Sequence, residues 1–268
     1  MYQSDNQKKY LKKIKKQKII VRLIQIILVS SIIVLWELLT RMDILNSFIY
    51  SSPTKIVETI YNLLIHGNLF THIFATLWEV LIAFSLGIFL SFFIAILFYE
   101  HPMMAKIFDP FLTVLNSLPK VALGPIIIIL AGANSKSIIV MALLINLIVS
   151  ILTIYNGFTN ADPIKLKMFK SFKATKLQTL FLLVIPSSLN TMISSLKLNI
   201  ALTLIGVITG EFLVSQKGIG YLIIYGTQVF NLNLVMSGII ILLIISYLLY
   251  KSVMMLEEKI LNKKQIDV

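Results

Sequence analysis

Side chains that could carry out chemistry are scarce in this chain of 268 residues. It has no cysteine, and its three histidines, His66, His72 and His101, do not have the spacing of metal ligands. It has no glycine-rich phosphate-binding loop. It also has neither the paired carboxylates nor the serine–lysine pair that would suggest a catalytic centre. We therefore predict a chain that is not an enzyme and that holds neither a metal ion nor a cofactor.

The composition indicates an integral membrane protein. Of the residues, 57% are hydrophobic and 13% are charged, and the mean hydropathy is +0.90. About a quarter of the residues of a soluble domain are charged. The net charge of +12 comes largely from lysines at the ends of hydrophobic stretches and in one loop. This distribution is typical of membrane topology and gives no reason to expect nucleic-acid binding.

Six hydrophobic stretches are long enough to cross a bilayer. They predict an all-α fold with transmembrane helices near Ile19–Leu39, Phe74–Tyr99, Ile107–Leu130, Ser137–Tyr155, Leu189–Val214 and Leu234–Tyr250. Residues 1–18 form a basic tail, and residues 19–268 form the transmembrane domain. Lysines concentrate in this tail, in the loop after the fourth span and near the C-terminus. Positive charge favours the cytoplasm, so we expect both termini there.

Polar residues follow one face of three predicted spans. The candidates for a solute pathway are Asn116, Ser117 and Lys120 in the third span, Asn146 and Ser150 in the fourth, and Asn199 and Thr203 in the fifth. Polar side chains at membrane depth often line a water-filled path. Small and hydroxyl residues also allow helices to pack closely, which is the alternative. We favour the pathway because three spans carry such a face, and Pro119 should kink the third span.

The loop between the fourth and fifth spans predicts two short helices. Asp162 and Pro163 are a favoured start for the first, and Thr175 with Gln178 forms a capping box for the second, which should end at Pro186. On the first helix the apolar Ile164, Met168 and Phe172 share one face, and Lys167, Lys170 and Lys173 share the opposite one. Such a helix either presents a surface to a partner or lies flat on anionic lipid.

Two further segments should lie on the outer side of the membrane. Ser52-Pro53 begins a short amphipathic helix, and residues 215–226 suit a re-entrant or interfacial turn. Three acidic residues, Glu37, Glu79 and Glu211, are each isolated near the end of a span. Ion-coupled secondary transporters use intramembrane titratable pairs, so isolated residues argue against that class.

Four segments, taken in order, resemble one known family. They are Trp36-Glu37-Leu38-Leu39, the stretch SLPKVALGP from Ser117 to Pro125, the loop 162–186, and Gly210-Glu211-Phe212-Leu213 followed by the stretch KGIGYLI from Lys217 to Ile223. The chain is similar to the membrane permease subunits of type I ABC importers, in the binding-protein-dependent branch for sulfonates, taurine and nitrate. The family core corresponds to about residues 70–252.

The resemblance implies a type I permease fold whose loop 162–186 forms coupling helices. These would dock on a cytoplasmic ATPase subunit through Asp162, Pro163, Ile164, Met168, Phe172, Ala174 and Thr175. The outer-face segment would include Glu211, Gly218 and Gly220. The family places Glu-Ala-Ala and a glycine where this loop has Lys167, Met168, Phe169 and Lys173, so the bend between the helices should be reached by another route.

The same resemblance implies a mechanism and partners. ATP would be used by the separate ATPase subunit, and an external solute-binding protein would deliver solute to a permease dimer in the bacterial plasma membrane. The spans would then open a central cavity to one side at a time. The solute would be a sulfonate-, taurine- or nitrate-like anion, or a pyrimidine precursor of thiamine. A secondary transporter and a purely structural membrane scaffold are the alternatives from other classes.

Overall fold

The computed structural model describes the backbone of residues 5–266 and the side chains of residues 13–260, and every regular element in this range is helical. Five segments are long and apolar enough to span a membrane, or six if one sharply bent pair counts as a single span. The long helices are α1 (Asp5–Arg41), α4 (Leu69–Glu100), α7 (Ser135–Thr159), α10 (Ile185–Val214) and α12 (Leu232–Ile266). The bent pair contains α5 (Pro102–Ser117) and α6 (Gly124–Ala131).

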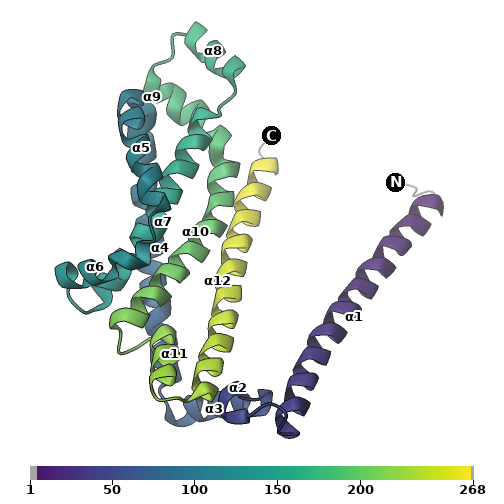
Figure 1. The fold of residues 1–268 in the computed structure, drawn as a ribbon. Helices are drawn as coiled ribbons and strands as arrows, with labels where there is room; N and C mark the ends of the chain where they lie inside the picture. Colours follow the sequence, from purple (N-terminus) through teal and green to yellow (C-terminus); the bar gives the residue numbers. More distant parts are fainter. Residues whose placement is uncertain (1–4, 267–268) are drawn as a thin grey trace.

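The helices form a bundle whose two ends carry different short helices. Figure 1 shows both ends of the chain at the same end of the molecule as α8 (Pro163–Ser171). The opposite end carries α2 (Ser47–Tyr50), α3 (Pro53–His66) and α11 (Ile219–Gln228). The amphipathic helix predicted after Ser52 is thus α3, with Ser52 as its N-cap. Helix α11 is too short to cross a bilayer, in keeping with the interfacial segment predicted there.

Glycines bring the central helices close together. Helix α7 lies between α4 and α10, and a Cβ atom added to Gly206 of α10 would lie 2.5 Å from Cα of Ala142 on α7. Gly210 lies about one helical turn after Gly206 on the same contact. A Cβ atom on Gly210 would lie 3.0 Å from Cα of Ile138 on α7. Side chains larger than hydrogen are therefore excluded at this contact, where α7 and α10 pack backbone to backbone.

The third predicted span is broken rather than kinked. Helix α5 ends at Ser117, a 3-10 turn covers Lys120–Leu123, and α6 follows at an angle of 92°. Leu118 is extended (φ −68°, ψ 139°) because the ring of Pro119 disfavours helical geometry in the preceding residue. Figure 1 shows α6 directed away from the axis of the bundle. The disturbance predicted at Pro119 is therefore present, but it is a break between two helices with a bend of 92° rather than a kink within one helix.

The second helix of the loop does not end at Pro186 as predicted. Helix α9 (Lys176–Thr179) continues through a π-helical turn, Leu180–Val184, directly into α10. Proline lacks an N–H group and its ring needs room in the preceding turn, and the wider π turn before Pro186 is compatible with both. The second helix of the loop and the fifth span are consequently one continuous helical segment from Lys176 to Val214.

Helix α1 stands apart from the bundle, and α2 and α3 connect it (Figure 1). Its apolar side chains are exposed along the helix, as at Ile27 (63%). From Asp5 onward the basic segment belongs to this same helix, so the boundary expected at residue 18 does not interrupt it. At the junction, Glu37 accepts hydrogen bonds from the backbone N–H (3.1 Å) and the hydroxyl (2.9 Å) of Thr54, and it pairs with Arg41 (2.7 Å).

Candidate coupling, translocation and outer-face sites

Helix α8 begins as its sequence predicts. The carboxylate of Asp162 accepts a hydrogen bond from the N–H of Ile164 (2.8 Å), and Pro163 occupies the first turn. At the start of α9, the hydroxyl of Thr175 accepts from the N–H of Gln178 (3.2 Å), and the side chain of Gln178 accepts from the N–H of Thr175 (2.8 Å). Both caps are formed by neighbours in the sequence, which fixes where the two short helices start.

The turn between α8 and α9 depends on Lys173. This residue adopts the left-handed conformation (φ 55°), and the N–H of Ala174 closes the turn onto the carbonyl of Phe169 (3.1 Å). We expected a different route for the bend because the related family places glycine here. The structure instead keeps a left-handed turn and uses lysine, at a cost of about 1–2 kcal/mol relative to glycine.

The three apolar residues predicted for one face of α8 are all exposed. Ile164 and Phe172 have 78% of their surface exposed, and Met168 has 47%. Phe172 lies just beyond the last helical residue, Ser171, and serves as the C-cap. This apolar surface stands at the end of the molecule farthest from α11 (Figure 1). Its role in docking stays a prediction.

The polar residues of the broken span lie at the break. Asn116 and Ser117 are exposed at the end of α5, and Lys120 is half-buried. The ammonium of Lys120 donates to the backbone carbonyl (3.0 Å) and the side-chain carbonyl (3.2 Å) of Asn116. A cation at a helix C-terminus satisfies carbonyls that the break leaves without helical partners.

The polar residues of α7 and α10 are instead enclosed between helices. Asn146, Ser150, Asn199 and Thr203 are at most 1% exposed. The side-chain amide of Asn146 donates to the hydroxyl of Thr203 (2.5 Å). That hydroxyl donates to the backbone carbonyl of Asn199 (2.7 Å). Both polar atoms of the Asn199 amide lack a hydrogen-bond partner among the described residues. The structure therefore gathers two predicted polar faces into one buried contact and leaves the third outside it.

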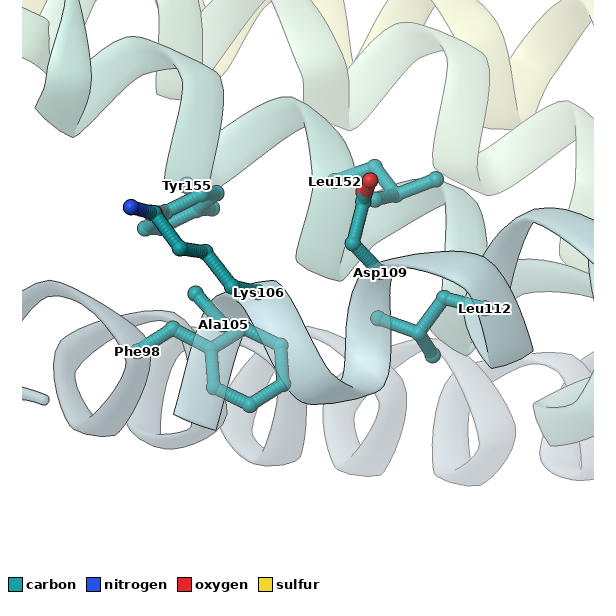
Figure 2. A pocket seen from close by; sticks show the side chains of 7 residues that line it. All are labelled: Phe98, Ala105, Lys106, Asp109, Leu112, Leu152 and Tyr155. Carbon is teal, nitrogen blue, oxygen red and sulfur yellow. The ribbon is translucent and has the colours of Figure 1, made fainter. Parts of the chain in front are cut away.

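An open, largely apolar cavity of about 230 Å³ with two charged residues in its lining lies between α4, α5 and α7. Figure 2 shows Lys106 and Asp109 of α5 extending from the same helix toward Tyr155 and Leu152 of α7. Phe98 of α4 and Ala105 form its floor in this view. Lys106 and Asp109 were not predicted as site residues, because two opposite charges near the end of a span match the ordinary pattern of an interfacial helix.

The three residues predicted for the outer-face segment form one close-packed contact. Glu211 of α10 is fully buried, and its carboxylate accepts from the N–H of Gly220 (2.5 Å) and from the hydroxyl of Thr76 (2.7 Å). Gly218 has φ 112°, and a Cβ atom there would lie 2.3 Å from the carboxyl carbon of Glu211. Glycine is therefore required at residue 218 both for its conformation and for the close approach of the carboxylate.

One member of this site was misjudged from the sequence. The sequence indicated that Glu79 of α4 is isolated, but it is only 3% exposed and its carboxyl group interacts with that of Glu211. The hydroxyl of Ser135, at the start of α7, is also within reach of Glu79. The interpretation of Glu79 and Glu211 as isolated residues was wrong, because α4 and α10 are remote in sequence but adjacent in the bundle. Glu79 and Glu211 each lack an acidic neighbour in their own helical turns, so the sequence gave no local signal of this pairing.

The bundle, the broken span and the helical loop at one end define a multi-pass membrane transport component. The chain belongs to the family of binding-protein-dependent transport system inner membrane components, which matches residues 87–266. It is therefore a permease of a binding-protein-dependent ABC importer and a non-catalytic subunit of the inner membrane. The family carries no cofactor, and its ATP is hydrolysed by a partner ATPase. Membership also implies a binding protein as partner and sets aside a secondary transporter or a scaffold.

Known relatives of low sequence identity support this assignment. The putative aliphatic sulfonates transport permease protein SsuC of Bacillus subtilis is 25% identical over 88% of this chain and 86% of its own length. The formylaminopyrimidine transport permease protein ThiX of Halalkalibacterium halodurans is 28% identical over 71% of this chain and 75% of its own. An inward-facing MetNI methionine ABC transporter structure has the same fold, with a TM-score of 0.59 and 14% identity over 70% of this chain and 94% of that one.

Proposed function

We propose that this permease carries a small anionic solute of the sulfonate, taurine or nitrate type. The observation that supports this most is the group at the broken span, where the ammonium of Lys120 lies beside the exposed Asn116 and Ser117. A cation beside an amide and a hydroxyl suits recognition of oxyanions. The relationship to an aliphatic sulfonate permease points to the same class of solute.

The test is uptake of a radiolabelled alkanesulfonate by the whole importer in proteoliposomes. Lys120→Gln should lower uptake at least tenfold, and Lys120→Arg should retain most of it, because arginine keeps the positive charge. Lys136→Gln is the matched control, since Lys136 is an exposed lysine at the start of α7. Equal uptake by the wild type and Lys120→Gln would contradict the proposal.

A formylaminopyrimidine-like solute is the second candidate, and it rests on the 28% identity to a permease named for that substrate. A neutral heterocycle would not need the ammonium of Lys120. Saturable uptake of a labelled formylaminopyrimidine that is insensitive to Lys120→Gln, with no uptake of alkanesulfonate, would replace the first candidate by the second.

Helix α8 is the proposed docking element for the ATPase subunit. Ile164, Met168 and Phe172 offer an apolar surface that is exposed in the permease alone. Asp162, Pro163, Ala174 and Thr175 set the shape of the loop that presents it. The lysines on the opposite face favour a partner cleft with acidic residues.

Docking is tested by Phe172→Ala in the assembled importer. Burial of a phenylalanine side chain contributes about 1.5–3 kcal/mol, so the affinity for the ATPase subunit should fall about tenfold or more. Lys167→Ala is the matched control on the opposite face and should have a smaller effect. If Phe172→Ala changes neither copurification of the ATPase nor solute-stimulated ATP hydrolysis, α8 is a helix that rests on the lipid surface.

The orientation and the dimer complete the proposal. The end that carries α8 and both termini faces the cytoplasm, and α11 faces outward. Two copies of the chain form the permease, and the exposed apolar surface of α1 is covered by the second copy and by lipid.

The orientation is tested with single cysteines at Asn68 and Lys259 and a membrane-impermeant thiol reagent in intact cells, because the chain has no cysteine of its own. Asn68→Cys should be labelled and Lys259→Cys protected, and the reverse result would invert the topology.

A further inference from the structure

The outer end of the bundle contains a pair of carboxyl groups without a countercharge in contact with either. Glu79 of α4 and Glu211 of α10 are 3% and 0% exposed, and their carboxyl groups are close enough to interact. Neither takes part in the ion pairs found among the described residues. Two ionised carboxylates in such contact repel each other strongly, and a shared proton removes that repulsion.

The hydrogen bonds around the pair leave a place for this proton. Both oxygens of Glu211 already accept from donors, namely the hydroxyl of Thr76 and the N–H of Gly220. One oxygen of Glu79, Oε2, is buried and receives no donor from the described residues. A buried acceptor without a donor is costly, and a proton held between the two carboxyl groups satisfies it.

The pair also determines how α11 is attached. Glu211 binds the N–H of Gly220 in the first turn of α11, and Thr76 accepts from the N–H of Ile219 (2.8 Å). In addition, the N–H of Gly218 donates to Nδ1 of His72 (3.1 Å). Three consecutive backbone N–H groups of the outer segment are thus held by α4 and α10, and two of these bonds depend on Glu211 directly or through Thr76.

Few other charged groups face this site. His72 of α4 and Lys217, just before α11, lie at the edge of the site. Ser135, at the start of α7, interacts with Glu79, and the next residue in the chain is Lys136. Helix α12 packs on α11, and its first charged residue is Lys251, 19 residues after its first residue, Leu232. The nearby ring of Tyr221 stacks on His72 at 5.8 Å between centroids.

We propose that Glu79 and Glu211 form a buried proton-binding site that fastens α11 to α4 and α10. With the proton bound, one carboxyl group donates to the other, and Glu211 keeps its bonds to Thr76 and Gly220. When the proton leaves, the two negative charges repel, Glu211 moves away from the first turn of α11, and the outer segment loosens. This site is independent of the solute and of the docking surface on α8.

Infrared spectroscopy of the full chain in lipid nanodiscs tests the proton. The wild type should show the carbonyl band of a protonated carboxylic acid at neutral pH, and Glu79→Gln should abolish it. Glu58→Gln, at an exposed acidic residue of α3, is the matched control and should leave the band unchanged. A wild type without this band, or a band that is the same in Glu79→Gln, would overturn the proposal.

A spin label on α11 tests the attachment. Because the chain lacks cysteine, Thr227→Cys places one label on an exposed position of α11. If the band disappears as the pH is raised, the label should become more mobile over the same pH range. In Glu79→Gln the mobility should stay low and independent of pH, because the amide keeps its hydrogens. Loss of the band without a change in label mobility would show that the proton does not fasten α11.

Discussion

The α7–α10 interface and the broken span both carry rows of polar side chains, but they hold them in opposite environments. Between α7 and α10, Asn146 and Thr203 bond to each other and are fully buried. At the break after α5, Asn116 and Ser117 are exposed. The difference lies in the neighbouring residues, since glycines such as Gly206 let α7 and α10 close on each other, whereas Pro119 separates α5 from α6. A polar row alone therefore does not define a pathway.

The largest effect is expected at the glycine contact. Gly206→Ala would place a Cβ atom 2.5 Å from the backbone of Ala142, so α7 and α10 must move apart. We expect a loss of about 1–3 kcal/mol or more, seen as a lower thermal stability in detergent. Gly124→Ala is the matched control, because its Cβ atom would meet the flexible end of Leu213 at 2.4 Å. Equal losses of thermal stability in the two variants would show that the α7–α10 interface is packed no more closely than the broken span.

A pair of asparagine variants separates structure from transport. Asn146→Leu loses the bond to Thr203 and adds bulk against Gly87, so it should destabilise the protein by about 1–3 kcal/mol. Asn116→Leu, on the exposed end of α5, should leave the thermal stability unchanged and reduce solute uptake by the whole importer. The comparison fails if Asn116→Leu lowers stability as much as Asn146→Leu.

The smallest effect on stability is expected at Asn199. Its amide is buried and unpaired among the described residues, so Asn199→Leu should be neutral or stabilising, by up to about 1 kcal/mol. Uptake measured per assembled complex decides its role. Normal uptake would assign Asn199 to packing, and reduced uptake with intact assembly would place it on the pathway, as predicted from the sequence.

Local features were predictable, and contacts between distant segments were not. The caps formed by Asp162 and Thr175 were correct because each involves residues two or three positions apart. Pro119 signalled a disturbed helix, but the bend of 92° depends on how α6 packs on α7 and was not visible in the sequence. The pairing of Glu79 with Glu211 was missed because hydropathy locates spans without saying which ones are neighbours.

The junction at Glu37 gives the first span the properties of a lever. Helix α1 has 37 residues and is therefore about 55 Å long, and the two bonds from Thr54 to the carboxylate of Glu37 lie near one end of it. A rotation of about ten degrees at this pivot would sweep the far end through about 10 Å. The carboxylate of Glu37 is thus a fixed point for a helix that extends from the end of the molecule that carries α2 and α3 toward the end that carries α8.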